Sequence, residues 1–284
     1  MTTDAATPEL EDFAALVTGG GSGIGLGCAR RLVVDGASVT ICGRTEDRLA
    51  AAVEELSVLS APSATVQYAV ADVTDEDSVA AAVAKACEPT GTLVATIACA
   101  GGSETLGPIT QMDTEAWRRT IDLNITGTML TIKHAARPMA ASGGGSIVGI
   151  SSIASSRTHR WFGAYGVGKE GIDHICKLAA DELGASGVRV NCIQPGLVDT
   201  ELVAFVTAGG PVLDSYFENM PIQRVGTVDD IAALARFLVG PESTWITGQV
   251  IGVDGGHSLR AGPDYSSILE PLYGPEAMRG IVNP

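Results

Sequence analysis

Three polar side chains in the second half of the sequence have the types and spacing needed for proton transfer. Tyr165 and Lys169 are four positions apart at the start of a predicted helix, which places the phenol and the ammonium on one helix face. Ser152 stands thirteen positions before Tyr165, at the end of the apolar segment 146–151. A free phenol is a poor base near pH 7, and a neighbouring ammonium favours its phenolate form. The pattern is typical of a site that moves a proton to or from a substrate oxygen.

A glycine-rich segment near the N-terminus, Thr18-Gly-Gly-Gly-Ser-Gly-Ile-Gly25, is the second chemical feature. It lies between a predicted strand and a predicted helix, where backbone N–H groups and the helix dipole can hold a pyrophosphate. Its spacing is G-x-x-x-G-x-G through Gly19, Gly23 and Gly25, not the dinucleotide fingerprint G-x-G-x-x-G. A tight strand-to-helix turn alone would also favour glycine. The position after the first strand favours the nucleotide-binding interpretation.

Both features need a scaffold, and the chain alternates short β-branched segments with Ala- and Leu-rich helical segments. This alternation predicts βαβ units and a parallel sheet. The predicted strands are 14–18, 38–42, 65–69, 94–98, 146–151, 189–193 and 250–253. The predicted helices are 24–35, 46–56, 75–87, 114–140, 164–183 and 228–239. We therefore expect one α/β domain over 1–284, doubly wound, with a seven-stranded parallel sheet, helices on both faces and a core of about 14–257. A long connection at 197–225 and a tail at 263–284 break the alternation.

Composition excludes several classes of partner. Lys and Arg total 18 against 33 Asp and Glu, a net charge of -15, which argues against nucleic acid or an anionic membrane surface as the main partner. No apolar segment approaches membrane-spanning length, and the acidic first twenty residues do not resemble a signal peptide, so we expect a cytoplasmic protein. The six cysteines form no C-x-x-C pair, which favours free thiols over disulfides and predicts no metal site.

The glycine motif, Ser152, Tyr165 and Lys169 occur in the order and spacing of the short-chain dehydrogenase/reductase family, which the sequence resembles from about residue 14 to 257. The resemblance implies a Rossmann-type fold and a catalytic tetrad of Asn124, Ser152, Tyr165 and Lys169. It also implies a set of nicotinamide-cofactor contacts, which are Gly19, Gly21, Ser22, Gly23, Ile24, Gly25, Asp72, Val73, Ala100, Gly101, Tyr165, Lys169, Pro195, Gly196, Val198 and Thr200.

The resemblance also implies a role for each tetrad residue. Tyr165 would exchange the proton at the reacting oxygen, and Ser152 would polarise that oxygen. Lys169 would bind the nicotinamide ribose, and Asn124 would hold a water that relays protons from Lys169. Each residue alone also has a structural interpretation. Ser152 suits a strand end, Tyr165 half-buried packing, Lys169 a solvated helix face and Asn124 a helix kink.

Cofactor preference depends on the end of the second predicted strand, where NAD enzymes of this fold usually carry a carboxylate that binds the ribose 2′-OH. This chain has Gly43 there, followed by Arg44, whose guanidinium can pair with a 2′-phosphate. We therefore expect NADP(H) rather than NAD(H). The second basic position of the family holds Ser22, and Arg44 as an ordinary surface charge is the alternative.

One position departs from the family pattern. Where an Asn-Ala-Gly triplet normally follows the fourth strand, the chain has Cys99-Ala100-Gly101. The family asparagine helps to tie the central sheet together, and a thiol is a weak donor and acceptor, so we expect weaker local ties. A redox-sensing or catalytic Cys99 is the alternative, but it needs a neighbour that stabilises a thiolate.

The connection 197–225 predicts an apolar lid over the substrate. Its large apolar side chains are Leu202, Val203, Phe205, Val206, Leu213, Tyr216, Phe217 and Met220. Trp161 and Phe162 are expected to line the same pocket, although the lid helices could instead pack only on their own domain. Further candidate polar contacts are His159, Arg160, Ser103 and Glu104. The tail either covers a neighbouring subunit or is a frayed terminus.

These inferences predict an NADP(H)-dependent oxidoreductase that interconverts a ketone and a secondary alcohol on a bulky apolar substrate, such as a 3-oxoacyl thioester, a steroid or a cyclic terpenoid. The alternatives are an NAD-dependent alcohol dehydrogenase of the same family and an inactive nucleotide-binding sensor or scaffold. Enoyl reductases of the family have a wider Tyr-to-Lys spacing than this chain. The resemblance also implies a homotetramer in which the segments 114–140 and 164–183 pair between subunits.

Overall fold

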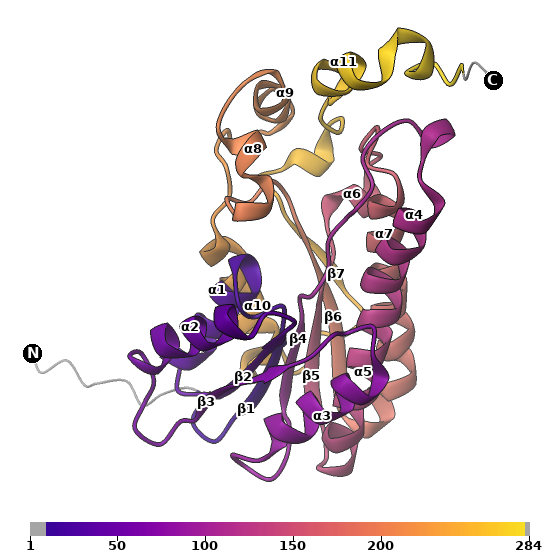
Figure 1. Ribbon diagram of the computed structural model, residues 1–284. Coiled ribbons are helices and arrows are strands. Elements are labelled where there is room, and N and C mark those ends of the chain that lie inside the picture. Colours follow the sequence, from indigo (N-terminus) through magenta and orange to yellow (C-terminus); the bar gives the residue numbers. More distant parts are fainter. Residues whose placement is uncertain (1–9, 282–284) are drawn as a thin grey trace, which may run out of the picture.

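A seven-stranded parallel sheet in the order β3-β2-β1-β4-β5-β6-β7 forms the centre of the computed structural model, which describes residues 10–281 (Figure 1). The strands are β1 Ala14–Thr18, β2 Ser38–Gly43, β3 Val66–Val70, β4 Ala95–Ala98, β5 Gly145–Ile150, β6 Val188–Pro195 and β7 Val250–Val253. The predicted doubly wound sheet is confirmed. The strand order reverses between β1 and β4, and ligands of such sheets bind at the carboxyl edge beside that reversal.

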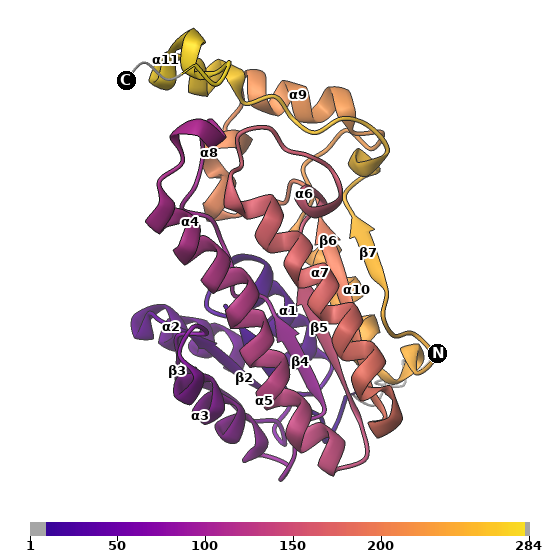
Figure 2. The same cartoon turned by 90° about the vertical axis from the view of Figure 1, so that its right-hand side faces the viewer.

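Helices cover both faces of the sheet (Figure 2). One face carries α1 Gly23–Val34, α2 Glu46–Ser57 and α10 Val228–Val239, and the other carries α3 Glu76–Cys87, α5 Gly127–Ala141 and α7 Ala164–Leu183. Consecutive residues of a strand point to opposite faces, so Val17 packs in the first layer and Leu16 in the second. Within residues 10–281, no helix has the length and apolar character needed to cross a bilayer.

The helix predicted at 114–140 is interrupted. It consists of α4 Thr114–Ile121, a π-helix Asp122–Thr126 and α5. The side-chain amide of Asn124 donates to the main-chain carbonyl of Thr120 at 2.8 Å. The same amide donates to the carbonyl of Gly102 at 2.7 Å. A single uninterrupted helix was therefore a wrong prediction, because a contact with the segment after β4 widens this turn.

The lid and the tail form one layer above the carboxyl edge of the sheet, which we call the cap (residues 197–225 and 263–281) (Figures 1 and 2). The lid contains α8 Ala204–Thr207 and α9 Pro211–Asn219, and the tail contains α11 Ser266–Ala277. The apolar residues of the cap pack together, and they include Val206, Val212, Tyr216, Met220, Tyr265 and Leu269. The alternative prediction of a frayed terminus was therefore wrong for α11, because this helix packs on the lid of the same chain. Residues 282–284 of the predicted tail lie outside the described residues.

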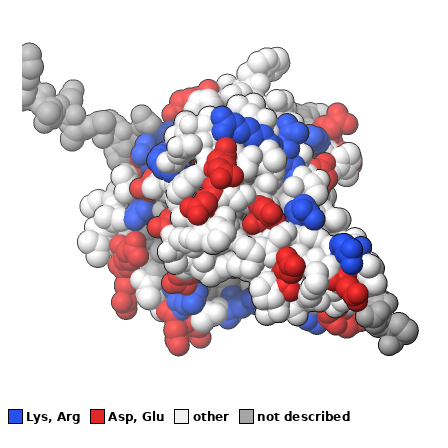
Figure 3. Space-filling view, turned by 90° about the horizontal axis from the view of Figure 1, so that it is seen from above, with Lys and Arg blue, Asp and Glu red and all other residues white. Residues whose placement is uncertain are grey.

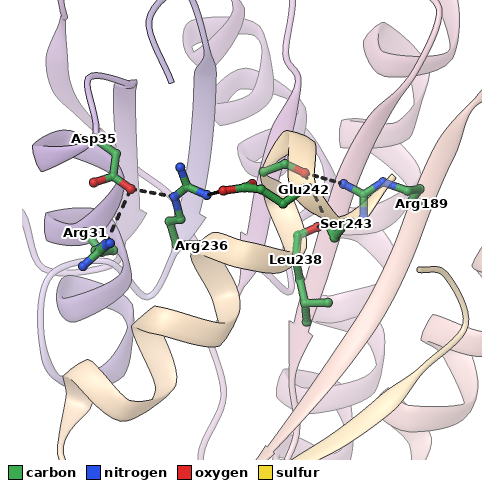
Figure 4. Close-up of polar contacts among 8 residues, drawn as sticks. Arg31, Asp35, Arg189, Arg236, Leu238, Glu242 and Ser243 are labelled. Atoms are coloured by element: carbon green, nitrogen blue, oxygen red, sulfur yellow. Dashed lines mark hydrogen bonds and ion pairs between the residues drawn. The ribbon is translucent and has the colours of Figure 1, made fainter. Parts of the chain in front are cut away.

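Two ion pairs join α1 to α10, one exposed and one buried. Arg30 pairs with Asp229 at 3.0 Å on the surface. Arg236 pairs with Asp35 at 2.6 Å and also with Glu242, and its side chain is only 6% exposed (Figure 4). Nearby, Arg189 of β6 donates to the carbonyls of Leu238 and Gly240 at the end of α10. These bonds hold the C-terminal half of α10 against α1 and the sheet.

The buried pair predicts a large effect on stability. We expect Arg236→Met to lower the free energy of unfolding by about 3 kcal/mol, because Asp35 keeps only the longer contact to Arg31 at 3.5 Å. The matched control is Arg30→Met, which removes the exposed pair between the same two helices and should cost less than about 1 kcal/mol. Urea unfolding measures both, and equal losses in the two variants would contradict the explanation.

His159 predicts how stability depends on pH. Its imidazole is buried beneath the cap, 5.1 Å from the Phe162 ring, and burial lowers its pKa to about 4. The unfolded chain has a histidine pKa of about 6.5, so between pH 6.5 and 4 the unfolded state binds more protons and stability falls as the pH falls. At pH 5 the expected loss relative to pH 8 is about 2 kcal/mol from this residue.

The measurement compares urea unfolding at pH 8 and pH 5 in the parent and in His159→Gln. We expect the acid loss to shrink by about 2 kcal/mol in the variant. His174→Gln, which changes an exposed histidine of α7, is the control and should leave the acid loss unchanged. An identical acid loss in the parent and His159→Gln is the result that would rule the explanation out.

Candidate active site

A cavity of about 720 Å³ opens at the carboxyl edge of the sheet and extends beneath the cap. All the side chains and glycines predicted to contact a cofactor line it. They are Gly19, Gly21, Ser22, Gly23, Ile24, Gly25, Arg44, Asp72, Val73, Ala100, Gly101, Tyr165, Lys169, Pro195, Gly196, Val198 and Thr200. Ser152 lines it as well, whereas Asn124 lies fully buried behind the wall. The fold thus brings these predicted residues to one place.

The glycine-rich segment has the geometry of an anion cradle. Gly23 has a φ of +53°, which favours glycine, and a Cβ at Gly25 would overlap the carbonyl oxygen of Gly19. The first helical bond of α1 runs from Leu26 N–H to the Ser22 carbonyl, so the N–H groups of residues 23–25 have no partner within the helix. The Ser22 side chain makes no capping bond either. These residues fit the pyrophosphate of a dinucleotide.

The far end of the cavity, beside β2 and α2, is lined by two arginines. Arg44 is exposed just after β2, and Arg48 stands one helical turn further on. Arg48 pairs at 3.3 Å with Glu201 of the lid. The sequence interpretation missed Arg48, although its spacing of four residues from Arg44 was a usable signal.

Asp72 lies on the cavity wall and is held by its own turn. Its carboxylate accepts from the N–H of Thr74 at 2.9 Å and from the Thr74 hydroxyl at 2.8 Å. The bond from the Thr74 N–H is the main cause of a lowered Asp72 pKa, and the positive charge of Arg44 contributes to it. Asp72 is therefore a carboxylate at neutral pH, fixed near the arginines.

Tyr165 and Lys169 occupy one face of α7, at the middle of the cavity. The Lys169 ammonium lies 5.5 Å from the centre of the Tyr165 ring and donates to the carbonyl of Ile150 at 3.0 Å. Ser152, the N-cap of α6 Ile153–Ser156, accepts the Ala154 N–H on its hydroxyl oxygen at 3.1 Å. Because that bond uses a lone pair, the hydroxyl proton of Ser152 remains available for a substrate oxygen.

Asn124 reaches the site from behind Gly101. A Cβ at Gly101 would lie 2.8 Å from Asn124 Oδ1 and 2.9 Å from Lys169 Nζ. The two groups therefore converge beside the Gly101 Cα, where a side chain would displace one of them. The π-helix turn holds Asn124 in this position through the bonds to Thr120 and Gly102. Asn124 therefore lies in the interruption of the helix, as its structural interpretation expected, and it also lies close to Lys169.

The Thr18 side chain makes hydrogen bonds between β1 and the end of β4, where we expected weaker bonding because residue 99 is a cysteine. Its hydroxyl oxygen accepts the N–H groups of Cys99 and Ala100, each at 3.1 Å, and these bonds join the end of β4 to β1. Burial raises the pKa of the Cys99 thiol to about 11. The thiol is therefore protonated at neutral pH, which argues against a nucleophilic or redox-sensing role.

The end of the cavity where the substrate would lie is beneath the cap. Some lid side chains line the cavity there and others pack only within the cap, so both interpretations of the lid apply in part. Leu202, Val203 and Phe205 line the cavity, whereas Val206, Leu213, Phe217 and Met220 pack within the cap. Phe162, His159, Ser103 and Glu104 line the cavity as expected. Trp161 and Arg160 do not: the Trp161 ring packs against the cap and the Arg160 guanidinium lies over it at 4.7 Å. The expectation that Trp161 lines the pocket was therefore wrong.

Tyr265, which the sequence interpretation assigned to the tail, also lines the cavity. No local pattern indicated this position, because Tyr265 reaches the cavity only through the packing of the tail on α9. Tyr216 of α9 lines the cavity beside it.

Comparisons with known proteins agree with this fold. A family model described as enoyl-(acyl carrier protein) reductase matches residues 19–258. A cis-4-hydroxycyclohexanecarboxylate dehydrogenase of Sinomonas cyclohexanicum is 37% identical over 246 residues, which are 86% of this chain and 96% of that protein. The solved structure of a short-chain type dehydrogenase/reductase from Mycobacterium ulcerans is 55% identical, with a TM-score of 0.95, over 96% of this chain and 100% of that one.

A further solved structure holds a cofactor. A short chain dehydrogenase from Burkholderia cenocepacia in complex with NADP is 31% identical, with a TM-score of 0.79, over 88% of this chain and 99% of that one. The family match, over residues 19–258, covers the glycines at 19–25, strands β2 to β7 and Tyr165 with Lys169. The chain therefore belongs to the short-chain dehydrogenase/reductase family of NAD(P)-dependent oxidoreductases.

Proposed function

We propose that the protein is an NADP(H)-dependent oxidoreductase that interconverts a ketone and a secondary alcohol. The observation that carries this proposal is the convergence of Tyr165, Lys169 and Ser152 on one cavity with the glycine-rich segment. When bound, a nicotinamide cofactor supplies or accepts the hydride. Tyr165 and Lys169 also have the narrow spacing that favours carbonyl chemistry over enoyl reduction.

In this proposal the chain's own residues manage the proton and the substrate oxygen. The Tyr165 hydroxyl gives its proton to the oxygen during ketone reduction and takes it back during alcohol oxidation. Ser152 donates its free hydroxyl proton to the same oxygen. Lys169 uses one N–H on Ile150 and keeps two for the ribose and for proton relay. Asn124, with its oxygen beside Lys169, holds the water that continues the relay.

The preference for NADP(H) rests on the charges at the end of the cavity beside β2 and α2, where the adenine would lie. We call this the adenine end. Gly43 places no carboxylate at the end of β2, and Arg44 is exposed there. Arg48 is a second cation within the cavity lining, although its present partner is Glu201. The NADP complex of the Burkholderia cenocepacia relative supports the same preference. An NAD-dependent alcohol dehydrogenase remains the second candidate, because Asp72 adds a negative charge nearby.

The proposed substrate is a bulky apolar ketone or alcohol. Leu202, Phe205 and Phe162 line the cap end of the cavity and would contact it. The face of the cap seen in Figure 3 carries basic and acidic side chains mixed together among uncharged ones, which suits a small molecule better than a polyanion. The related enzyme of Sinomonas cyclohexanicum, named for a hydroxycyclohexane derivative, supports a cyclic substrate.

We also propose that the protein is a homo-oligomer, most simply a tetramer. Apolar side chains are exposed on the two helices that the family resemblance pairs between subunits, namely Met129 on α5 and Val167 and Leu178 on α7. Light scattering at micromolar concentration should therefore give a mass near four chains. A mass near the 29.0 kDa of one chain would reject the proposal.

The catalytic assignment predicts that Tyr165→Phe lowers turnover about a thousandfold or more, because the variant keeps the ring and loses the proton. Cofactor affinity, measured by fluorescence titration, should change little, because the cradle is untouched. Tyr68→Phe, a change on β3 outside the cavity lining, is the matched control and should keep full turnover. Near-normal turnover of Tyr165→Phe on any verified substrate would exclude the assignment.

The cofactor assignment predicts that NADPH binds about tenfold more tightly than NADH, the value of one charge-assisted hydrogen bond. Arg44→Ala should remove most of this difference by weakening NADPH alone, and high salt should reduce it in the parent. Arg31→Ala on the exposed side of α1 is the control. If Arg44→Ala weakens NADH as much as NADPH, Arg44 stacks on the adenine without reading the phosphate, and the preference returns to NAD(H).

A further inference from the structure

Five aromatic side chains, two of them from the cap, form a closed ring of contacts where the cap meets the segments before α7 and after β7. The Phe162 ring lies 5.1 Å from His159 and 4.8 Å from Tyr265, measured between ring centres. The His257 ring lies 6.0 Å from His159 and 5.2 Å from Tyr216. The hydroxyls of Tyr216 and Tyr265, 3.5 Å apart, close the ring. We call these five residues the aromatic group.

The aromatic group is built next to the reacting centre from segments far apart in the sequence. His159 and Phe162 precede α7, Tyr216 belongs to α9, and His257 and Tyr265 follow β7. The Phe162 ring also lies 5.9 Å from the Tyr165 ring. The rings of Tyr165 and Tyr265 are therefore no more than about 11 Å apart, because each contacts Phe162. A six-membered ring, or two fused ones, can span such a distance.

The tyrosine pair offers hydrogen-bond donors to this space. Tyr216 and Tyr265 are 5% and 3% exposed, and both line the cavity. A bond between the two hydroxyls uses only one of their two protons, so one O–H remains for a ligand. Burial raises the pKa of both phenols, so both are neutral donors at physiological pH.

His159 adds an acceptor. Its Nδ1 lies 2.9 Å from the carbonyl oxygen of Arg157, and since a carbonyl only accepts, Nδ1 carries the hydrogen. The lowered pKa of about 4 leaves the imidazole with a single proton at neutral pH, so Nε2 has a free lone pair. Among the described residues, no donor is bonded to this nitrogen. A ligand hydroxyl could therefore both receive a proton from a tyrosine and donate to His159.

Among the described residues that line the cavity, none at this end is a cation that could receive an anionic group. Of the basic residues in the cavity lining, Arg44 and Arg48 lie at the adenine end and Lys169 lies below Tyr165. Glu104, which also lines the cavity, is already paired with Arg119 at 2.8 Å. A buried carboxylate placed among the aromatic group would lose its hydration without gaining a counter-ion, which is unfavourable.

We infer that Tyr216, Tyr265 and His159 form a subsite for a second oxygen atom of an uncharged cyclic substrate, whose first oxygen reacts at Tyr165. This inference rests on the proposed carbonyl/alcohol function and names its substrate class. The second oxygen is a hydroxyl or a carbonyl carried across the ring from the reacting carbon. The subsite separates this protein from its relative named for a hydroxycyclohexanecarboxylate, whose substrate carries an acid group.

The first experiment compares 4-hydroxycyclohexanone with 4-methylcyclohexanone, two neutral ketones in which a hydroxyl replaces a methyl group. With NADPH, the parent should have a kcat/KM about tenfold higher for the hydroxyl compound, as expected of one good hydrogen bond. Tyr216→Phe combined with Tyr265→Phe should lower this ratio by about tenfold. Tyr273→Phe is the matched control, because its hydroxyl bonds the Leu106 carbonyl from the same tail without lining the cavity.

Two outcomes of this experiment overturn the subsite. One is a parent that prefers the methyl compound. The other is a ratio that Tyr273→Phe lowers as much as the double variant does, since the tail packing and not the hydroxyls would then be responsible. The parent's own preference is measured without any substitution, so the test does not depend on the double variant folding.

The second experiment tests charge with 4-oxocyclohexanecarboxylate and its methyl ester. The parent should reduce the ester at least about a hundredfold more efficiently, because the acid would bury an unpaired carboxylate. Equal efficiency, or a preference for the acid, would overturn the uncharged substrate class.

Binding separates a failed subsite from a failed function. Calorimetry in the presence of NADP⁺ compares 1,4-cyclohexanediol with 4-methylcyclohexanol in the parent and the double variant. If no ketone is reduced but the diol binds about tenfold more tightly in the parent alone, the subsite stands and the proposed function fails. If both ketones are reduced with the same ratio in the parent and the double variant, the function stands and the subsite fails.

Discussion

The buried ammonium of Lys169 is the constraint on which the centre of this site depends. The residue is 4% exposed, and among the described residues no carboxylate lies within ion-pair distance of its nitrogen. A buried cation is costly unless its hydrogens find acceptors, so the surrounding main chain has to supply them. The Ile150 carbonyl at the end of β5 does so directly. Asn124 brings a second oxygen close, and this requires the π-helix turn and the absence of a side chain at Gly101.

Around this centre the cavity is divided by charge. The adenine end has two arginines and the N–H groups of a helix terminus, which suit phosphates, together with the carboxylates of Asp72 and Glu201. The cap end has aromatic rings, two neutral phenols and a neutral imidazole, which suit an uncharged molecule. Because the two ends differ in this way, the proposed dinucleotide would lie with its phosphates beside the arginines and the proposed neutral substrate would lie beneath the cap.

The parts that the sequence predicted are those with local patterns. The strands were visible as short β-branched segments, and residues at their carboxyl ends could be placed at one edge without knowing any side-chain contact. The π-helix turn was not predictable, because it depends on a bond from Asn124 to Gly102, on another segment. The cap was not predictable either. Its helices are short, α11 contains Pro271 and Pro275, and such helices are stable mainly through packing on each other. Tyr216 and Tyr265 meet across 49 positions of sequence, which no periodicity reports.

The turn before α7 shows how the rigid centre and the cap are joined. Trp161 has a φ of +74°, a left-handed conformation that costs a residue with a large side chain about 1–3 kcal/mol. The turn is retained by tertiary contacts, since the Trp161 carbonyl accepts the Gly107 N–H at 2.7 Å and its ring packs against the cap. The reversal at Trp161 lets Phe162, the next residue, line the cavity while Trp161 faces the cap. Phe162 then contacts Tyr165 on one side and Tyr265 on the other. The cap therefore contacts Tyr165, the proposed proton donor, by way of the Phe162 ring, and the C-terminal tail itself lines the cavity through Tyr265.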